Sequence, residues 1–411
     1  MAKLLNHPRA IDVMSRHKLD GLAAMVPINA YYVSGYWNLL MEAGFDASVA
    51  AVLPRDETQP AALITLAFDT RNVSNAAPWV KNVIIYTDTA SPGNETPGGG
   101  AKYNGWGTRQ GVALSARQQR WVDDTARMTS STAPSALHGL VKGLKDAGLE
   151  RGTIGVDDER LLQWLPEMGL TQAKLVPARH IFNEIRIVKT PAEIDLLRAA
   201  ARINETSVMK ALHALHEGAE WSEMERIYMM EMAAHGARGI YLECGAGGLQ
   251  SGKVVRHEAV MFDGLGTYKG YHGDFGRSAV IGDPGPDIAA RVKGFEAGWR
   301  AAYESIKPGV RYSEIAAKVI DAVKKSGFPG TFRPPVVHSL GLQHTDDPVS
   351  RLDPPGKKPD RVLEADMVLN VDLPHLEIGW GAVHIEDTVR VTKDGCEPLT
   401  SMETALRVLP A

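Results

Sequence analysis

The glycine-rich stretch from residue 260 to residue 280 constrains the fold of this chain more than any other feature. It begins with an apolar run, Val260–Phe262, and ends with a second, mostly apolar run, Ser278–Ile281. Such runs on either side of turn residues predict the two strands of a hairpin. Gly264, Gly266 and Gly270 predict the reversal between the strands, because glycine reaches backbone angles that other residues avoid.

Two carboxylates, Asp263 and Asp274, lie eleven residues apart in this stretch. A hairpin would bring them together at its interior face, since alternate residues of a strand point to the same side. Burying two carboxylates side by side is costly unless a cation neutralises them, which favours a metal site. Ordinary turn aspartates are the alternative, because Asp and Gly are both common in turns.

A second unit of this kind lies near the C-terminus. The apolar run Met367–Asp372 ends in a carboxylate, and Ala382–Thr392 alternates with a period of two, which predicts two more strands. Asp372 and Glu386 are then a second pair of strand-borne carboxylates. One face of the later strand is expected to carry Val383, Ile385, Asp387, Val389 and Val391, and the other His384, Glu386, Thr388 and Arg390.

Two histidines, His338 and His344, lie between the two units along the chain. Four carboxylates and a histidine on repeated hairpins suit two hard or borderline divalent ions. Two such ions would activate a water molecule and polarise a carbonyl group, which predicts hydrolysis. The alternatives are a core histidine at His338 and a solvated glutamate at Glu386, paired with Arg390.

The order of these residues resembles the "pita-bread" metallopeptidases, a family that includes methionine aminopeptidase, aminopeptidase P, prolidase and creatinase. The resemblance covers the C-terminal half of the chain. The family's Gly-His-Gly-Ile-Gly-Leu corresponds to Val337–Leu342, and its Arg-Ile-Glu-Asp-Thr corresponds to His384–Thr388. The family pattern Asp-x-Gly, then Gly-Tyr-x-x-Asp-x-x-Arg, is met by Asp263, Gly270, Tyr271, Asp274 and Arg277, with the first glycine displaced to Gly266.

The resemblance implies a set of metal ligands and a kind of reaction. It implies that two divalent ions, of manganese, zinc, iron or cobalt, activate the water that cleaves the substrate. Their ligands would be Asp263, Asp274, His338, Asp372 and Glu386.

The chain departs from the family at several places in this site. Asp372 stands where the family has Glu and is one methylene shorter, so one ion is expected to be held less tightly, with Glu377 as a candidate substitute. A histidine that family peptidases carry upstream of the first Asp is missing from residues 244–252. A second family histidine corresponds to Thr345, and His344 lies one place earlier.

The catalytic and substrate-binding roles follow from the same resemblance. Asp372 or a nearby histidine, His344 or His375, is expected to move protons. His344 and His375 are also expected to contact the substrate. Trp37 is a further candidate, which would reach the site of a neighbouring subunit. It belongs to the segment Asn29–Trp37, which resembles the family signature Asn-x-x-Tyr-x-x-Gly-aromatic and whose aromatic residues are otherwise expected in the core.

The 411 residues are too many for one ordinary hydrophobic core, which predicts two domains. Residues 1–180 alternate helical and strand patterns, and the resemblance implies a creatinase-type, ribonuclease-H-like α/β domain. Residues 181–411 are expected to form the α+β pita-bread catalytic domain. In the first domain, strands are predicted at Gly21–Pro27, Val49–Leu53, Ala61–Ile64, Val83–Tyr86 and Ile154–Val156, and helices at His7–His17, Ala133–Ala147 and Leu161–Met168.

The joint between the domains is marked by the start of a long helix. Thr190 as N-cap, Pro191 at the first helical position and Glu193 as the partner of the cap predict a capping box. Ser222 and Glu225 predict a second box for the next helix. Further helices are predicted at Asp287–Ile306 and Ser313–Lys325, so the order helix, helix, hairpin occurs twice, which is typical of a pseudo-twofold catalytic domain.

Composition excludes several classes of protein. The chain is 44% hydrophobic and 23% charged, with no tract that would span a bilayer and no apolar signal peptide. Cys244 and Cys396 do not suggest a disulfide scaffold, and a net charge of −4 gives no reason to expect nucleic-acid or membrane binding. A cytoplasmic protein is therefore expected. The run Gly98–Gly100 is not a phosphate loop, because no Lys-Ser/Thr follows at Walker spacing.

Three functions remain open from the sequence. The first is a dinuclear metallohydrolase that cleaves a small amide, such as an Xaa-Pro dipeptide. The second is a non-peptide relative, because the same fold hosts creatinase, ectoine hydrolase and a dimethylsulfoniopropionate lyase, and the altered histidines favour it. The third is a binding protein, which the retention of all five donor positions argues against. A small-molecule or short-peptide substrate and a homodimer are expected as partners.

Overall fold

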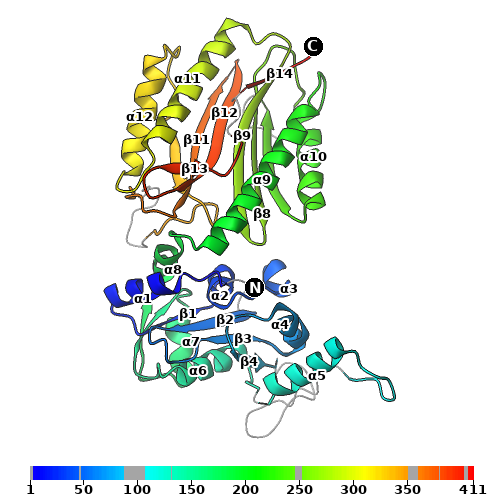
Figure 1. Cartoon of the computed structure of the whole chain (residues 1–411), viewed down its shortest axis with the longest axis vertical. Helices are drawn as coiled ribbons and strands as arrows, with labels where there is room; N and C mark the ends of the chain where they lie inside the picture. Colours follow the sequence, from blue (N-terminus) through cyan, green and yellow to red (C-terminus); the bar gives the residue numbers. More distant parts are fainter. Residues whose placement is uncertain are drawn as a thin grey trace. The chain divides into compact units, whose positions relative to one another are not determined.

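A computed structural model describes residues 3–45, 48–87, 107–130, 132–245, 252–349, 360–378, 380–401 and 406–411. The chain divides into two compact units, Met1–Ile185 and Arg186–Ala411, and each unit has its own sheet (Figure 1). None of the helices in the described ranges is both long and apolar enough to cross a membrane. The glycine run at residues 98–100, and most of residues 244–252, lie outside the described residues.

The N-terminal unit is built on a six-stranded mixed sheet. Each helix and strand predicted for this unit is present, with ends that differ by a few residues. The strand order is β4 (Asn82–Tyr86), β3 (Ala62–Leu66), β2 (Val49–Pro54), β1 (Gly21–Ala24), β5 (Thr153–Val156) and β6 (Lys174–Pro177). β1 and β3 each pair antiparallel with β2, whereas the pairs β3–β4, β1–β5 and β5–β6 are parallel.

Helices cover this sheet. α6 (Ala136–Asp146) packs on β2, β3 and β4, and its Leu140 and Leu144 lie in the apolar core. Of the helices in this unit, only those at His7–Arg16, Ala136–Asp146 and Leu161–Glu167 were predicted, and strand β6 was not predicted. The other helices are α1 (His7–Arg16), α2 (Pro27–Ser34), α3 (Leu39–Glu42), α4 (Thr70–Ala76), α5 (Ala116–Met128), α7 (Leu161–Glu167) and α8 (Arg179–Arg186), with a 3-10 turn η1 (Ala67–Asp69).

The aromatic signature segment of this unit has a structural role. Asn29 in α2 donates to Asp157 Oδ2 at 2.8 Å, and Asp157 also accepts two backbone N–H groups at the entry to the helix. Gly35 ends the helix with a φ of 73°, a left-handed conformation that suits glycine. Tyr36 donates its hydroxyl to the buried Asp69. The tyrosines of the segment are buried, which confirms that they belong to the core.

The C-terminal unit is built on a second sheet, and both predicted hairpins are present in it. The path of this eight-stranded sheet is β10 (Val336–Ser339), β11 (Val368–Glu377), β12 (Gly381–Val391), β9 (Tyr271–Ile281), β8 (Val260–Tyr268) and β7 (Arg238–Gly245). Two short strands lie off this path: β13 (Cys396–Pro398) pairs with β12, and β14 (Leu406–Leu409) pairs with β9. Strands β7, β10, β13 and β14 were not predicted.

Two pairs of helices pack on this sheet (Figure 1). α9 (Pro191–His213) lies against β8 and β9, and α10 (Trp221–Ala234) lies against β7. α11 (Gly285–Ser305) lies against β11 and β12, and α12 (Tyr312–Lys325) packs on α11 and β10. The predicted order of two helices followed by a hairpin therefore occurs twice in the structure.

One of the two predicted capping boxes is present. Thr190 Oγ1 accepts the backbone N–H of Glu193 at 3.2 Å, and Glu193 Oε2 accepts that of Thr190 at 2.9 Å, which confirms the box at the start of α9. The box predicted at Ser222 was wrong. α10 begins at Trp221, after an N-cap residue, Glu220, whose side chain makes no capping hydrogen bond.

Of the three glycines predicted to mark the reversal of the first hairpin, one lies at the turn. The chain reverses at Gly270, which has a φ of 85°, after β8 and β9 have paired over their full lengths. Gly264 and Gly266 lie inside β8, so the prediction that they mark the reversal was wrong. A Cβ at these positions would overlap Val208 of α9 and Met232 of α10. The two glycines therefore allow the helices to pack closely on the strand.

The two hairpins are joined on the helix-covered face by a buried ion pair. Arg277 in β9 donates to Asp387 Oδ1 in β12 at 2.9 Å, and both side chains are fully buried. Arg277 also donates to the backbone carbonyl of Glu386 at 3.0 Å. This ion pair fixes the edge along which the first hairpin meets the second.

The close approach of β9 to α9 gives a stability prediction. A Cβ at Gly273 would lie 2.6 Å from the backbone carbonyl carbon of Ala200, and a helix backbone cannot move aside as a side chain can. Gly273→Ala is expected to lower the free energy of unfolding in urea by about 1–3 kcal/mol. The matched control is Gly395→Ala, where the nearest atom lies 3.9 Å from the new Cβ. Equal stability of the two variants would contradict the prediction.

Candidate metal centre

Strands β8, β9, β11 and β12 carry the predicted carboxylates on the face opposite their helices. Phe262 and Phe275 point into the core with α9 and α10, so their neighbours Asp263 and Asp274 point to the other side. Leu373 and Ile385 point into the core with α11 and α12 in the same way, so Asp372 and Glu386 also point away from the helices. The period-two prediction for β12 is confirmed by this arrangement.

A first group of possible ligands consists of Asp274, His338 and His344, with one donor atom from each within 4.8 Å of the others. His344 Nε2 lies 2.9 Å from Asp274 Oδ2, and His338 Nε2 lies 4.0 Å from the same oxygen. His338 Nδ1 lies 3.1 Å from the carbonyl oxygen of Ser339. A proton on Nδ1 would donate to that carbonyl and leave the Nε2 lone pair directed at the group.

A second group consists of Asp263, His384 and Glu386, again within 4.8 Å of one another. Glu386 Oε1 accepts a hydrogen bond from Asn370 Nδ2 at 2.8 Å, and Glu386 Oε2 lies 3.6 Å from His384 Nε2. Asp263 keeps part of its surface exposed, but its Oδ1 is buried and has no hydrogen-bond partner among the described residues. His384 was not predicted as a ligand.

Asp372 lies directly across from Glu386 in the β11–β12 ladder. Its Oδ1 lies 2.7 Å from His384 Nε2, so its nearest polar neighbour is an imidazole. Glu377, the candidate substitute for Asp372, is engaged elsewhere: it pairs with Arg291 at 3.0 Å and with His375 at 3.3 Å. The structure therefore keeps Asp372, and not Glu377, with the other carboxylates.

The buried atoms of these two groups fit a bound cation. One oxygen of Asp263 and one of Asp274 are buried without a hydrogen-bond partner in the described part of the chain. Burial raises the pKa of Asp263 to about 7, and burial together with the neighbouring carboxylates raises the pKa of Glu386 well above its usual range. Burial alone would lower the pKa of His384, but the hydrogen bond to Asp372 and the surrounding carboxylates raise it to about 9. Such a shortage of positive charge is what a divalent ion relieves.

One of the predicted substrate-binding residues of the C-terminal unit is not brought to this cluster. His375 lies on the helix-covered face of β11, with its ring centroid 5.6 Å from that of Phe295 and 5.3 Å from that of Phe328. Trp37 lies in the N-terminal unit and donates its indole N–H to Glu42 at 2.9 Å. His344 is the predicted substrate-binding residue that does lie at the cluster, and its side chain is 43% exposed.

Three residues that surround the candidate ligands were not predicted from the sequence. His384 contacts Asp372, and Asn370 holds Glu386. Thr388 Oγ1 donates to Asn370 Oδ1 at 2.6 Å. His384 and Thr388 share the face of β12 that was predicted to carry Glu386, so the alternation of that strand was the signal that could have found them.

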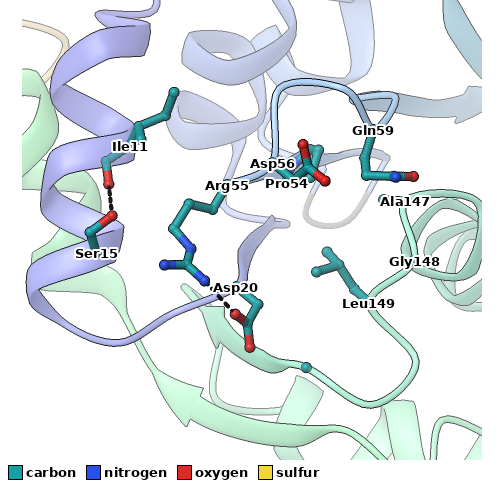
Figure 2. Close-up of a pocket in the computed structure, with 11 residues that line it drawn as sticks. Ile11, Ser15, Asp20, Pro54, Arg55, Asp56, Gln59, Ala147, Gly148 and Leu149 are labelled. Atoms are coloured by element: carbon teal, nitrogen blue, oxygen red, sulfur yellow. Dashed lines mark hydrogen bonds and ion pairs between the residues drawn. The ribbon is translucent and has the colours of Figure 1, made fainter.

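The N-terminal unit contains a groove of about 500 Å³ between α1, β2 and the end of α6 (Figure 2). Its charged side chains include Arg55 and Asp20, which form an ion pair at 2.7 Å and are both partly exposed. The two candidate ligand groups lie in the other unit. The groove is therefore not the metal centre.

Comparison with known proteins agrees with the geometry. The model of "Metallopeptidase family M24" matches residues 195–393, and that of the "Creatinase/Prolidase N-terminal domain" matches residues 7–188. An Xaa-Pro dipeptidase from Pyrococcus furiosus is 27% identical over 241 residues, which are 55% of this chain and 66%, just under two thirds, of that protein. The probable dipeptidase PepE of Mycobacterium tuberculosis is 27% identical over 284 residues, 66% of this chain and 74% of that one.

Solved structures show the same two-domain fold at low sequence identity. A prolidase from Pyrococcus furiosus has a TM-score of 0.67 and 19% identity, and covers 96% of this chain and 99% of its own. An Xaa-Pro dipeptidase from Bacillus anthracis has a TM-score of 0.71 and 18% identity, and covers 98% and 99%. The predicted fold, a creatinase-type α/β domain followed by a pita-bread domain, is confirmed, and the chain belongs to metallopeptidase family M24.

Proposed function

We propose that the C-terminal unit is a hydrolase that binds two divalent ions and cleaves a short peptide at an Xaa-Pro bond. The observation that carries the proposal is the pair of donor groups on one face of one sheet, each within 4.8 Å and each with an unpartnered buried carboxylate oxygen in the described structure. The substrate class is supported by similarity to proteins named Xaa-Pro dipeptidase and prolidase.

The residues that would hold the ions are Asp274 and His338 on one side, Asp263 and Glu386 on the other, and Asp372 across from Glu386. When bound, divalent ions supply Lewis acidity, which activates water and polarises a carbonyl group. Ligands that are mostly oxygen with some imidazole suit manganese, iron, cobalt or zinc.

The chain's own residues would orient these ligands. Asn370 donates to one oxygen of Glu386, and Thr388 in turn donates to Asn370, so the remaining Glu386 oxygen has a fixed direction. The carbonyl of Ser339 fixes the ring of His338 in the same way. This support comes from buried residues of the sheet and does not depend on loops.

His344 is the candidate for moving protons. Its Nε2 contacts Asp274 while nearly half of its side chain is exposed, so one imidazole reaches both the cluster and the solvent. An imidazole of this kind can accept and release a proton near neutral pH. Asp372 has less access, because its exposed fraction is 22% and it is bonded to His384. We therefore assign proton transfer to His344 ahead of Asp372.

A second candidate function is cleavage of a C–N bond in a small non-peptide amide. It is favoured by the altered histidines, because Thr345 stands where the family resemblance places a histidine, and His344 instead forms a hydrogen bond with Asp274.

A homodimer in which Trp37 reaches the site of the neighbouring subunit is also part of the proposal.

The first prediction concerns metal content. The purified protein, incubated with manganese or zinc and then desalted, is expected to hold about two divalent ions per chain. Asp274→Asn and His338→Gln each replace a candidate ligand with a neutral amide, a weaker donor, so both are expected to bind less metal by elemental analysis and to lose roughly 100-fold or more in turnover. The control is His213→Gln, an exposed histidine at the end of α9. A wild-type protein without metal under these conditions would refute the dinuclear site.

The second prediction concerns pH in the presence of a chelator. A group whose pKa is raised by folding stabilises the protein below its unfolded pKa, and this stability is lost as pH rises through the folded value. Asp263, with a pKa of about 7, and His384, with a pKa of about 9, both act in this direction. The free energy of unfolding of the chelated protein is therefore expected to fall as pH rises from about 4 to about 9.

The variant that tests this is Asp263→Asn, which should remove about 2–4 kcal/mol of the fall between about pH 4 and about pH 8 in urea titrations. Asp321→Asn is the control, because Asp321 is an exposed carboxylate on α12 paired with Lys325. Identical slopes for both variants would show that Asp263 is not a strained buried carboxylate.

The third prediction concerns the substrate. The zinc- or manganese-loaded protein is expected to hydrolyse Xaa-Pro dipeptides faster than matched Xaa-Ala dipeptides, creatine or small betaines. Release of free proline, followed by chromatography, measures the rate. Turnover of the non-peptide compounds alone would support the second candidate function, and a metal-loaded protein inert toward the whole panel would contradict a hydrolase.

A further inference from the structure

His384 is a fully buried imidazole among the carboxylates, and the ligand set given above does not use it. Its Nε2 lies 2.7 Å from Asp372 Oδ1 and 3.6 Å from Glu386 Oε2. It also lies within one 4.8 Å group with donor atoms of Asp263 and Glu386. The ring nitrogen therefore faces the same space as three carboxylates on three strands.

The position of this ring is fixed by strand β9. Ser278 Oγ accepts the backbone N–H of His384 at 2.7 Å and donates to its carbonyl oxygen at 3.1 Å, which clamps the backbone. Gly276 lies across from both Glu386 and Asp263 in the sheet. A Cβ at residue 276 would overlap the imidazole and lie 2.9 Å from its Cγ. The absence of a side chain at Gly276 thus makes the space that the His384 ring occupies.

An ion pair between His384 and Asp372 does not by itself explain how the atoms around the ring are arranged. A proton on His384 Nε2 pairs the ring with Asp372 only, while Asp263 Oδ1 stays buried without a partner among the described residues and Glu386 Oε2 stays beyond hydrogen-bond distance. An ion in the space between these atoms would satisfy all of them at once. Imidazole is a common ligand of divalent transition metals.

We propose that His384 Nε2 is a further ligand of the ion held by Asp263 and Glu386, so that each of the two ions has an imidazole donor. The inference rests on the proposed function, because it assumes that ions are bound at these carboxylates. It also accounts for Asp372: a shorter carboxylate leaves room for the ring that lies against it. An added nitrogen donor shifts the preference of that site from manganese toward zinc or cobalt.

The test counts the imidazoles around bound zinc in the full-length protein. Zinc X-ray absorption gives the mean number of imidazole ligands per ion, and elemental analysis gives the number of ions. His384→Gln is expected to lose one imidazole for every two ions and to bind its second zinc at least 10-fold more weakly. His213→Gln is the control and should match the wild type in both measurements.

A second variant keeps the imidazole in the chain but removes its space. Gly276→Ala is expected to displace the ring and to give the same loss of one imidazole for every two ions. If His384→Gln, loaded with two zinc ions like the wild type, keeps the imidazole count of the wild type, the inference is overturned and the metal site stands. A wild type that binds no zinc overturns the proposed function itself, which separates the two failures.

Discussion

Mutual repulsion among four carboxylates on one face of a sheet is the constraint on which the C-terminal unit depends. Asp263, Asp274, Asp372 and Glu386 come from four neighbouring strands, and backbone hydrogen bonds prevent those strands from moving apart. On the other face of the sheet, the buried pair of Arg277 with Asp387 joins the two hairpins at the same place. The fold thus forces together charges that water would keep apart, and a bound cation would offset the cost.

The candidate ligands could be predicted from the sequence because their pattern is local. A period of two fixes which side chains share a face, and this was enough to group Glu386 with the face opposite the core. The same alternation puts His384 on the face of Glu386, but the contacts of its ring with Asp372 and Gly276 depend on two other strands and have no local signal. The prediction that Gly264 and Gly266 mark a turn was wrong for a similar reason. Their small size serves packing against α9 and α10, and nothing in the neighbouring sequence distinguishes this from a turn.

The short side chain of Asp372 is connected with the position of the His384 ring. A glutamate at position 372 would extend its carboxylate by roughly one C–C bond, about 1.5 Å, into the region where His384 Nε2 now lies 2.7 Å from Asp372. A long carboxylate and this ring compete for the same volume. In the proposed arrangement, the exchange of an oxygen donor for a nitrogen donor keeps the number of ligands while it changes the ion that the site prefers.

Other buried carboxylates of this chain have cationic or hydrogen-bonding partners within the protein. Asp346 pairs with Arg186 at 2.6 Å and Lys189 at 3.5 Å, and Asp157 accepts three N–H groups. The chain therefore supplies cations or donors where a buried acid only has to be tolerated. At Asp263 and Asp274 the described residues supply no such partner to one oxygen each. A bound cation would satisfy such a buried oxygen, and this difference within one molecule favours the cluster, rather than the other buried acids, as the metal site.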